Sequence, residues 1–463
     1  MTALPSPSSS SPSTSSPAVG TAHPFDSLLE LPDDTRVHTL SNGVRLLVIH
    51  QPGAPGVSVS VFLRSGGQHE PARQGGISHV IEHMAFKGSA TRNCQQINLD
   101  AERLGAEVNA HTDRDHTAYQ MRGLAAHTLP LLRMLADLVL HPTFPQEELD
   151  RERQVILHEL TDVEDDAYAV AWRLFDQAAY GRHPFARPVI GSRSSIEKLT
   201  RQDLLDHLQQ RCTGSNLIVA VAGPLPAEAL LAEVEAGFGH LDAGAPNRVE
   251  PARWIGGVRI KRHGGSSQSQ VVLGWPIARL EQLQPADAVA AAVLGEGMSS
   301  PMLDELRERR GLAYHINVVA EQQELGGQFV VEGATSPKQL PEFLEGTLAL
   351  LRRHAEWVEP IDLERARHQL LVRALHDRER PMRRLEEAAV DLFVLGRVRS
   401  NRERLQALQS VGLEAVRCSV QTLLCQPPAL AITGRAPAGT RDHFAALLHS
   451  FGLPLRQADP TQT

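Results

Sequence analysis

Two histidines and one glutamate in a short stretch have the types and spacing needed to use a metal ion. His79, Glu82 and His83 lie in the segment 75–87, which begins with two glycines and is predicted to be helical. Residues four apart on a helix lie about 40° apart around its axis, so both imidazoles point the same way and Glu82 shares their face. The pattern predicts that the imidazoles bind zinc and that Glu82 activates a water. The alternative is an ordinary polar helix face.

A third ligand must come from elsewhere, because hydrolytic zinc sites usually take three protein ligands and leave one position for water. Glu159 is the best candidate, in a helix predicted over Glu147–Asp162. Glu152 lies two turns earlier on the same face, and we expect it to orient a ligating imidazole. Both glutamates could equally be ordinary carboxylates on a solvated helix. Three nearby histidines are rival ligands: His127, His141 and His158.

The elements that must position these residues occur twice along the chain. Each half has an amphipathic run, then a helix near a proline, and later a short apolar strand followed by a turn. These elements lie at 127–140, 144–160 and 217–223 in the first half, and at 338–352, 359–375 and 429–434 in the second. Each half also opens with strands, and Asn42-Gly43 suits the tight turn of a hairpin in the first.

Strands followed by helices, repeated, predict an α+β fold. We expect two homologous α/β-sandwich domains, each an antiparallel sheet packed by helices, related by an internal duplication. Chance similarity of two α+β halves is the alternative. The expected segments are a disordered Ser/Pro-rich tail (1–24), an N-terminal zinc-binding catalytic domain (25–241), a linker (242–256), a C-terminal homologous domain without metal (257–457) and a tail (458–463).

Composition narrows the classes of function. The chain has 463 residues, 42% of them hydrophobic and 22% charged, as in ordinary globular proteins with more than one domain. A net charge of −8 argues against nucleic-acid binding. No apolar run approaches the roughly 20 residues that span a bilayer, and no signal peptide is evident, so we expect no membrane association and a cytoplasmic location. The four cysteines match neither a disulfide framework nor a paired zinc spacing.

These motifs resemble the insulinase/pitrilysin family of inverzincin metallopeptidases, and especially its mitochondrial-processing-peptidase-like branch. The family pattern is His-x-x-Glu-His, with a glutamate as third ligand about 76 residues after the second histidine, which falls at Glu159. The resemblance spans essentially residues 35–440. Its further matching stretches are Phe86-Lys87-Gly88, Asn109-Ala110, Phe144-Pro145, the run from Glu152 to Glu159, and residues 183–191.

The resemblance implies roles for residues outside the metal motif. Asn109 and Ala110 match a strand at whose edge the family binds its substrate. Arg307 and Tyr314 match a pair through which the second half contacts the substrate and helps stabilise the tetrahedral intermediate. The second half has no histidine near 286–294, where the metal-binding helix should recur, so we expect one Zn²⁺ per chain.

The resulting expectation is a zinc-dependent metalloendopeptidase that hydrolyses short or unfolded peptides, with processing of a small peptide precursor as a specialised role. The rival hypotheses are a non-catalytic structural or partner subunit of a two-chain peptidase, and a zinc hydrolase of other substrates on an unrelated fold. The resemblance implies a homodimer, or a heterodimer with a related inactive subunit. Whether Arg307 and Tyr314 act within one chain or across that interface stays open.

Overall fold

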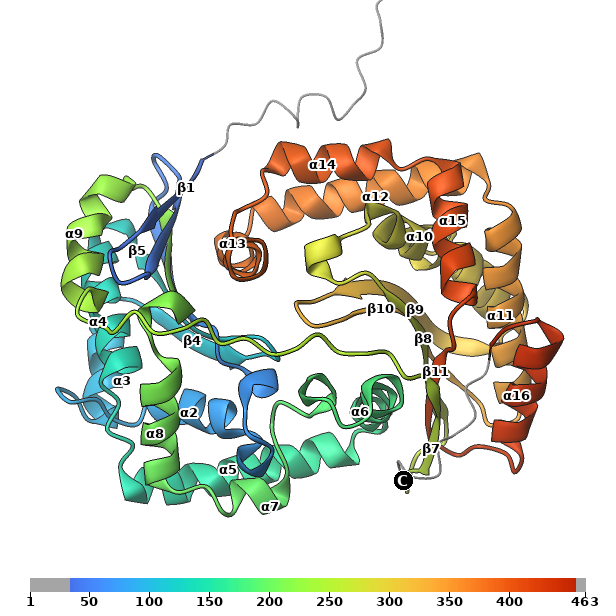
Figure 1. Cartoon of the computed structure of the whole chain (residues 1–463), viewed down its shortest axis with the longest axis horizontal. Coiled ribbons are helices and arrows are strands. Elements are labelled where there is room, and N and C mark those ends of the chain that lie inside the picture. The colour runs from blue at the N-terminus through green and yellow to red at the C-terminus, as the bar shows by residue number, and fades with distance from the viewer. Residues whose placement is uncertain (1–33, 455–463) are drawn as a thin grey trace, which may run out of the picture.

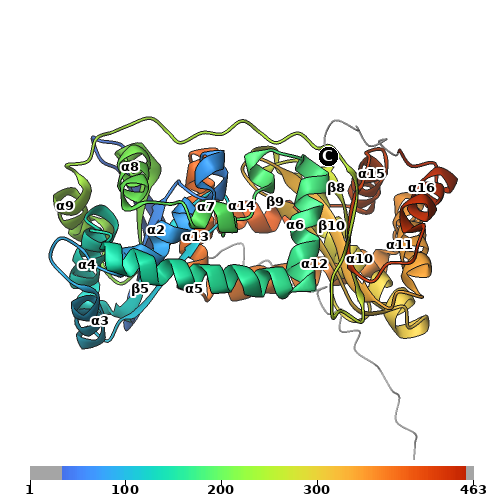
Figure 2. The same ribbon diagram turned by 90° about the horizontal axis from the view of Figure 1, so that it is seen from below.

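The computed structural model describes residues 34–454 of the chain. The tails expected at 1–24 and 458–463 lie outside the described residues. Each half of the chain has one β-sheet at its centre, and helices lie against both sheets (Figure 1). A connection without helix or strand, 241–256, runs along one side of the molecule from one half to the other (Figure 2).

The first sheet has six strands in the order β1-β2-β6-β3-β5-β4. The strands are β1 (Thr35–Thr39), β2 (Arg45–His50), β3 (Gly56–Leu63), β4 (Glu107–Thr112), β5 (Thr117–Leu124) and β6 (Leu217–Gly223). β1 and β2 form the predicted hairpin, in which Gly43 takes a φ of 91° that favours glycine.

The second sheet has five strands in the order β7-β11-β8-β10-β9. The strands are β7 (Gly257–Arg262), β8 (Ser269–Ile277), β9 (Ala313–Gln322), β10 (Gly327–Thr335) and β11 (Ala429–Gly434). Apart from β1, the two sheets have the same strand order and the same direction at each pairing. The predicted α+β fold with an internal duplication is therefore confirmed.

The sheets are mixed, because the expected antiparallel pairing holds at every strand pair except one in each sheet. β6 pairs in parallel with β2, and β11 pairs in parallel with β7. The reason is topological. β6 lies between β2 and β3, which run in opposite directions, so β6 must be parallel to one of them. β11 lies in the same way between β7 and β8.

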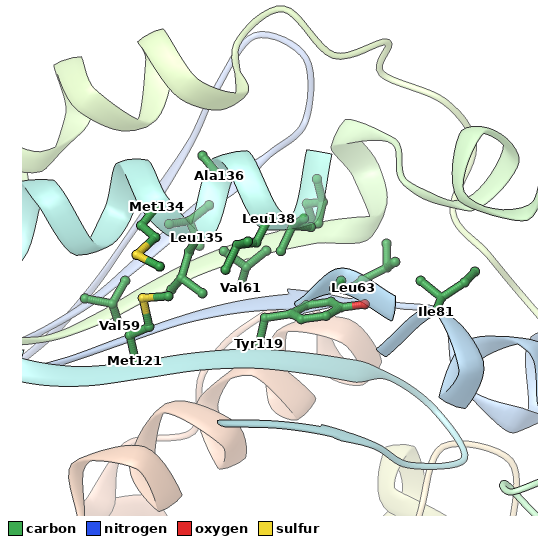
Figure 3. Packing of buried hydrophobic residues seen from close by; sticks show 14 of the residues in the cluster. Val59, Val61, Leu63, Ile81, Tyr119, Met121, Met134, Leu135, Ala136 and Leu138 are labelled. Atoms are coloured by element: carbon green, nitrogen blue, oxygen red, sulfur yellow. The ribbon is translucent and has the colours of Figure 1, made fainter. Parts of the chain in front are cut away.

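Most helices of the first half cover one face of the first sheet. The helices are α2 (Ile77–Ala85), α3 (Cys94–Arg103), α4 (Thr128–Leu140), α5 (Gln146–Asp165), α6 (Ala167–Tyr180), α7 (Arg193–Ile196), α8 (Arg201–Arg211) and α9 (Ala227–Phe238). Figure 3 shows Leu135 and Leu138 of α4 above Val61 and Tyr119 of the sheet, with Ile81 of α2 to the side. The alternation of apolar residues along these strands builds this core.

The second half repeats the arrangement. Its helices are α10 (Pro285–Gly295), a π-helix (Leu303–Arg309), α11 (Leu340–Glu356), α12 (Pro360–Arg378), α13 (Pro381–Leu395), α14 (Asn401–Ser410), α15 (Leu413–Leu424) and α16 (Thr440–Ser450). Across residues 34–454, no helix has both the length and the apolar character needed to cross a bilayer.

The two halves exchange one helix each. α13, from the second half, covers the other face of the first sheet, where Leu385 packs in a cluster with Phe62. α6, from the first half, lies on the second sheet, where Phe175 packs in a cluster with Val272 and Val330. Each sheet is thus buried on one face by a helix of the other half, and this exchange joins the halves into one body.

Candidate metal centre

The helix that carries the metal motif, α2, begins at a tightly packed corner. Gly76, the residue before it, has a φ of 92°, and a Cβ there would meet the backbone oxygen of Ile190 at 2.6 Å. The buried carboxylate of Glu70 accepts hydrogen bonds from the backbone N–H groups of Gly76 and Ser78. The first turn of a helix otherwise leaves such groups unpaired, so these contacts fix where α2 starts and how it is directed.

Apolar side chains hold one face of α2 in the core and leave the motif on the other. The buried apolar residues are Ile77, Val80, Ile81, Met84 and Ala85. α5 brings Glu159 to the two imidazoles. Oε2 of Glu159 lies 3.9 Å from Nε2 of His79 and 3.7 Å from Nε2 of His83. The cluster has one ligand atom from each residue, all within 4.8 Å of one another.

The three atoms fit a zinc ion. Zinc–ligand bonds of about 2.0–2.2 Å place neighbouring ligand atoms of a tetrahedron roughly 3.3 Å apart. The observed separations from Glu159, 3.7 and 3.9 Å, need only a small side-chain adjustment. Burial, and secondarily the charge of His83, lower the pKa of His79 to about 4. His79 is therefore neutral at pH 7, which is the form of histidine that binds metal.

Glu152 lies beside His83, where the spacing on α5 predicts it. Its Oε2 is 3.0 Å from Nδ1 of His83, and its Oε1 is 2.7 Å from Nζ of Lys87. Burial opposes the charge of Glu152, but hydrogen bonds from Lys87 and His83 outweigh burial and hold its pKa below the ordinary value. The ionised carboxylate keeps the proton of His83 on Nδ1 and leaves Nε2 free to bind a metal.

Glu82 lies on the ligand face of α2 without joining the ligand cluster. The hydroxyl of Thr112, the last residue of β4, donates a 2.6 Å hydrogen bond to Oε2 of Glu82. Burial raises the pKa of Glu82, while the hydrogen bond from Thr112 acts in the opposite direction. A carboxylate with one oxygen held and a raised pKa is suited to take up and release a proton.

The rival histidines lie outside this cluster. Nδ1 of His127 is 2.9 Å from the backbone oxygen of Leu104. The ring of His141 stacks on that of His240, and His158 is exposed to solvent. In the described part of the chain, none of the three shares a metal-binding cluster with His79.

Asn109 and Ala110 lie on an edge strand. β4 is the last strand of the first sheet and, among the described strands, pairs with β5 alone. Asn109 is exposed and Ala110 is half-buried. The outer edge of β4 therefore offers backbone groups to an added strand, and Thr112 connects the same strand to Glu82.

The structure does not join Arg307 or Tyr314 to the metal ligands. Arg307 lies in the π-helix, where its guanidinium contacts Met298 and Glu308. Tyr314 lies near the start of β9 and is 78% exposed. Within residues 34–454, neither forms a hydrogen bond or ion pair with the residues of the motif or with Glu159. Their roles stay a prediction.

The sequence analysis did not identify two residues that contribute contacts to this site. Thr112 could have been found from alternation, because it shares one face of β4 with Val108 and Ala110, which pack against the core below α2. Lys87 follows the motif directly, but no local pattern shows that it pairs with Glu152. That pairing needs the fold, which brings α5 alongside α2.

Two family models match the chain. "Insulinase (Peptidase family M16)" matches residues 45–193, and "Peptidase M16 inactive domain" matches residues 198–370. Together they cover more than half of the chain, which therefore belongs to peptidase family M16. The predicted resemblance to the insulinase family is confirmed. The first match contains His79, Glu82, His83 and Glu159, and the second begins before β6, a strand of the first sheet.

Curated relatives carry the names of proteases. The uncharacterized zinc protease YmxG of Bacillus subtilis is 28% identical over 407 residues, which cover 87% of this chain and 98% of that protein. An uncharacterized zinc protease of Mycobacterium leprae is 29% identical over 408 residues, or 86% of this chain and 91% of that protein. A probable mitochondrial-processing peptidase subunit beta of Schizosaccharomyces pombe is 32% identical over 246 residues, which cover 52% of this chain and 54% of that protein. Family and names support a zinc-dependent peptidase.

Solved structures show the same fold. A protease from Helicobacter pylori has a TM-score of 0.78 at 18% identity, and the match covers 88% of this chain and 100% of that one. A peptidase M16 inactive domain from Pseudomonas fluorescens has a TM-score of 0.80 at 20% identity, and the match covers 88% of this chain and 99% of that one. Both solved structures therefore share the fold of this chain.

Proposed function

We propose that this chain is a zinc metalloendopeptidase that hydrolyses peptide bonds of short or unfolded peptides. One observation carries the proposal: His79, His83 and Glu159 bring their ligand atoms together, and Glu82, held by Thr112, stands on the same face. A non-catalytic partner subunit has no use for Glu82 in addition to the ligands. We assign one catalytic Zn²⁺ per chain to this cluster.

The chemistry divides between the metal and the protein. Zinc held by these ligands supplies Lewis acidity, which makes water a nucleophile near neutral pH. Glu82 takes up the proton that the attacking water loses, using the oxygen that Thr112 does not hold. The same carboxyl group then gives this proton to the amine that leaves when the peptide bond breaks.

The substrate is proposed to bind as an extra strand. Backbone hydrogen bonds to the outer edge of β4, near Asn109 and Ala110, would hold an extended peptide across the site. Only a short or unfolded chain presents such a backbone. We propose that Arg307 and Tyr314 contact the peptide from the second half and stabilise the negative oxygen of the tetrahedral intermediate.

We also propose a domain division and an assembly. The zinc site belongs to the proposed domain 25–241, and the Arg/Tyr pair belongs to the proposed domain 257–457. Because one relative is named a subunit of a processing peptidase, we propose a homodimer or a heterodimer with a related inactive subunit. Processing of a small peptide precursor is the specialised activity that such an assembly would serve.

Glu82→Gln tests the proposed function, because it removes the proton acceptor and keeps the shape of the side chain. We expect unchanged zinc content and a loss of hydrolysis of about 10²–10⁴-fold. His83→Ala should in addition lose the zinc ion of this site. Glu147→Gln, an exposed position on α5, is the matched control and should change neither quantity. Elemental analysis measures the zinc, and mass spectrometry of a digested peptide library measures cleavage.

Two outcomes would contradict the proposal. Full hydrolysis by purified Glu82→Gln would exclude Glu82 as the acid/base. A folded, zinc-loaded wild-type protein that cleaves no peptide in the library would favour the non-catalytic partner subunit.

A further inference from the structure

A second group of potential metal ligands lies outside the site described above. His111, Asp113, His116 and Glu386 each place one ligand atom within 4.8 Å of the others. The first three lie at the end of β4 and in the turn to β5, whereas Glu386 lies on α13, in the other half of the chain. We call these four residues the inter-half cluster.

The spacing within the inter-half cluster resembles that of the catalytic ligands. Nε2 of His111 lies 3.2 Å from Oε1 of Glu386 and 4.0 Å from Oδ2 of Asp113. Nε2 of His116 lies 3.9 Å from Oε1 of Glu386. A tetrahedral zinc site needs about 3.3 Å between neighbouring ligand atoms, so the four side chains are close to a binding arrangement.

His116 gives an independent indication of a ligand. It is only 2% exposed, and within the described part of the chain its Nε2 has no hydrogen-bond partner. On the other side of the ring, Nδ1 lies 2.9 Å from Oδ1 of Asp115. This carboxylate can hold the ring proton on Nδ1, which leaves the Nε2 lone pair directed at the cluster. A buried polar atom without a partner costs free energy, and a metal ion would satisfy it.

The pair of Asp115 and His116 repeats the relation of Glu152 to His83. In both, a carboxylate lies about 3 Å from Nδ1 of a histidine whose Nε2 faces other potential ligands. Carboxylates in this position fix the tautomer of metal-binding histidines.

The inter-half cluster is separated from the catalytic site by β4 itself. His111 is opposite Ala118 in the register of β4 and β5, and Ala118 packs in the cluster beneath α13. The next residue, Thr112, points to the other face, where it holds Glu82. The two groups of ligands therefore lie on opposite faces of the same strand.

Neighbouring cations do not fill the inter-half cluster. Arg114, in the same turn, pairs with Asp176, and Arg383, on α13, lies near Glu387. The cluster borders a cavity of about 790 Å³ between the halves, lined by Asp113, His116 and Glu386 among others, so a dissolved ion can reach it. Two imidazoles with two carboxylates suit zinc or a similar transition metal better than calcium or magnesium, which prefer oxygen ligands alone.

We propose that His111, Asp113, His116 and Glu386 bind a second divalent cation of the zinc class, which ties the β4–β5 turn to α13. This cation takes no part in hydrolysis. The cation holds the edge strand β4 in place from the face opposite Glu82. This structural role is separate from the proposed function.

Metal counting in four full-length proteins tests the proposal. The proteins are the wild type, His83→Ala, Glu386→Gln and the double variant, each stripped of metal and dialysed against buffered Zn²⁺. We expect two zinc ions per chain in the wild type, one in each single variant and none in the double variant. Glu387→Gln, the adjacent carboxylate of α13, is the matched control and should retain two.

A second measurement keeps the test valid if Glu386→Gln folds poorly. Added Zn²⁺ should raise the melting temperature of His83→Ala and slow amide exchange in residues 112–117, because binding to the folded state stabilises it. His83→Ala/His116→Gln should lose both effects.

The outcomes separate this proposal from the proposed function. Folded His83→Ala that binds no zinc, or that keeps its zinc when Glu386→Gln is added, overturns the second site, and the four residues are then an ion-pair cluster only. If the wild type and His83→Ala each bind one zinc ion and Glu386→Gln binds none, the second site stands and the catalytic assignment fails.

Discussion

At the candidate metal centre, the proposed ligands lie beside groups that can orient them. Lys87 contacts Glu152, Glu152 contacts His83, and Thr112 holds Glu82. Lys87 lies in the loop after α2, Glu152 on α5 and Thr112 on β4, so a side chain outside the ligand set can still decide how well a metal is held. The consequence is measurable at the level of single side chains.

Glu152→Gln should weaken zinc binding without removing a ligand. The neutral amide no longer favours the Nδ1–H form of His83 by charge, and loss of such a partner typically lowers metal affinity about 10–100-fold. Competition with a chelator of known affinity measures the change. Glu147→Gln on the same helix is the control, and equal affinity in the two variants would show that Glu152 has only a structural role.

Thr112→Val should alter the pH profile and leave zinc in place. The hydrogen bond from Thr112 lowers the pKa of Glu82, so its loss should raise that pKa further. Glu82 must be ionised to accept a proton, so the acid limb of kcat/KM should move to higher pH, with roughly 10-fold lower activity on that limb. Thr112→Ser keeps the hydroxyl and should retain the wild-type profile, and an unchanged profile in Thr112→Val would contradict this role.

The sequence predicted much of the site at this scale, but not the contacts between the two halves of the chain. His79, Glu82 and His83 were predictable because helical spacing alone puts them on one face. Glu159 needed the family spacing, since nothing local separates it from other glutamates on α5. The contact of His111 with Glu386 could not be predicted, because 386 lies on a helix that packs against the sheet of the opposite half.

Among the elements, α6 and α13 have the most unusual positions. Each follows the long helix of its own half and then packs on the sheet of the other half, α6 under β8, β10 and β11, and α13 over β2, β3 and β6. Local sequence predicts that both are helices. It does not predict their partners, because an apolar helix face fits either sheet.

Leu392→Ala should loosen the first sheet although Leu392 belongs to the second half. Leu392 is 3% exposed in the cluster between α13 and the first sheet, and truncation of such a side chain typically costs about 2–5 kcal/mol. We expect faster amide exchange in β6, measured by mass spectrometry. Arg383→Ala, exposed on the same helix, is the control, and faster exchange confined to residues 257–454 would contradict the exchange of helices.

The strand directions within each sheet likewise could not be predicted from local sequence. Turn signals, alternation and apolar runs predicted β2, β3 and β6 as strands, but β6 is separated from its neighbours by most of the helices of its half. Strand order depends on how those helices return the chain to the sheet, and this information is not contained in the residues of the strand.

For the molecule as a whole, the exchanged helices make the two halves depend on each other. A chain cut between the exposed residues Glu250 and Pro251 should give two pieces that are poorly soluble alone, because each exposes the sheet face that its missing helix covers. Co-expression should recover a complex, measured by co-purification and size-exclusion chromatography. A soluble, monomeric piece 1–250 with native zinc content would contradict this expectation.

The same exchange limits how far the two halves can move apart. Swinging the halves apart would expose the apolar surfaces that α6 and α13 cover, so the burial of these helices opposes such a motion. For the proposed peptidase this implies selection by thickness: an extended chain would fit beside β4, whereas a folded protein of any sequence would be excluded.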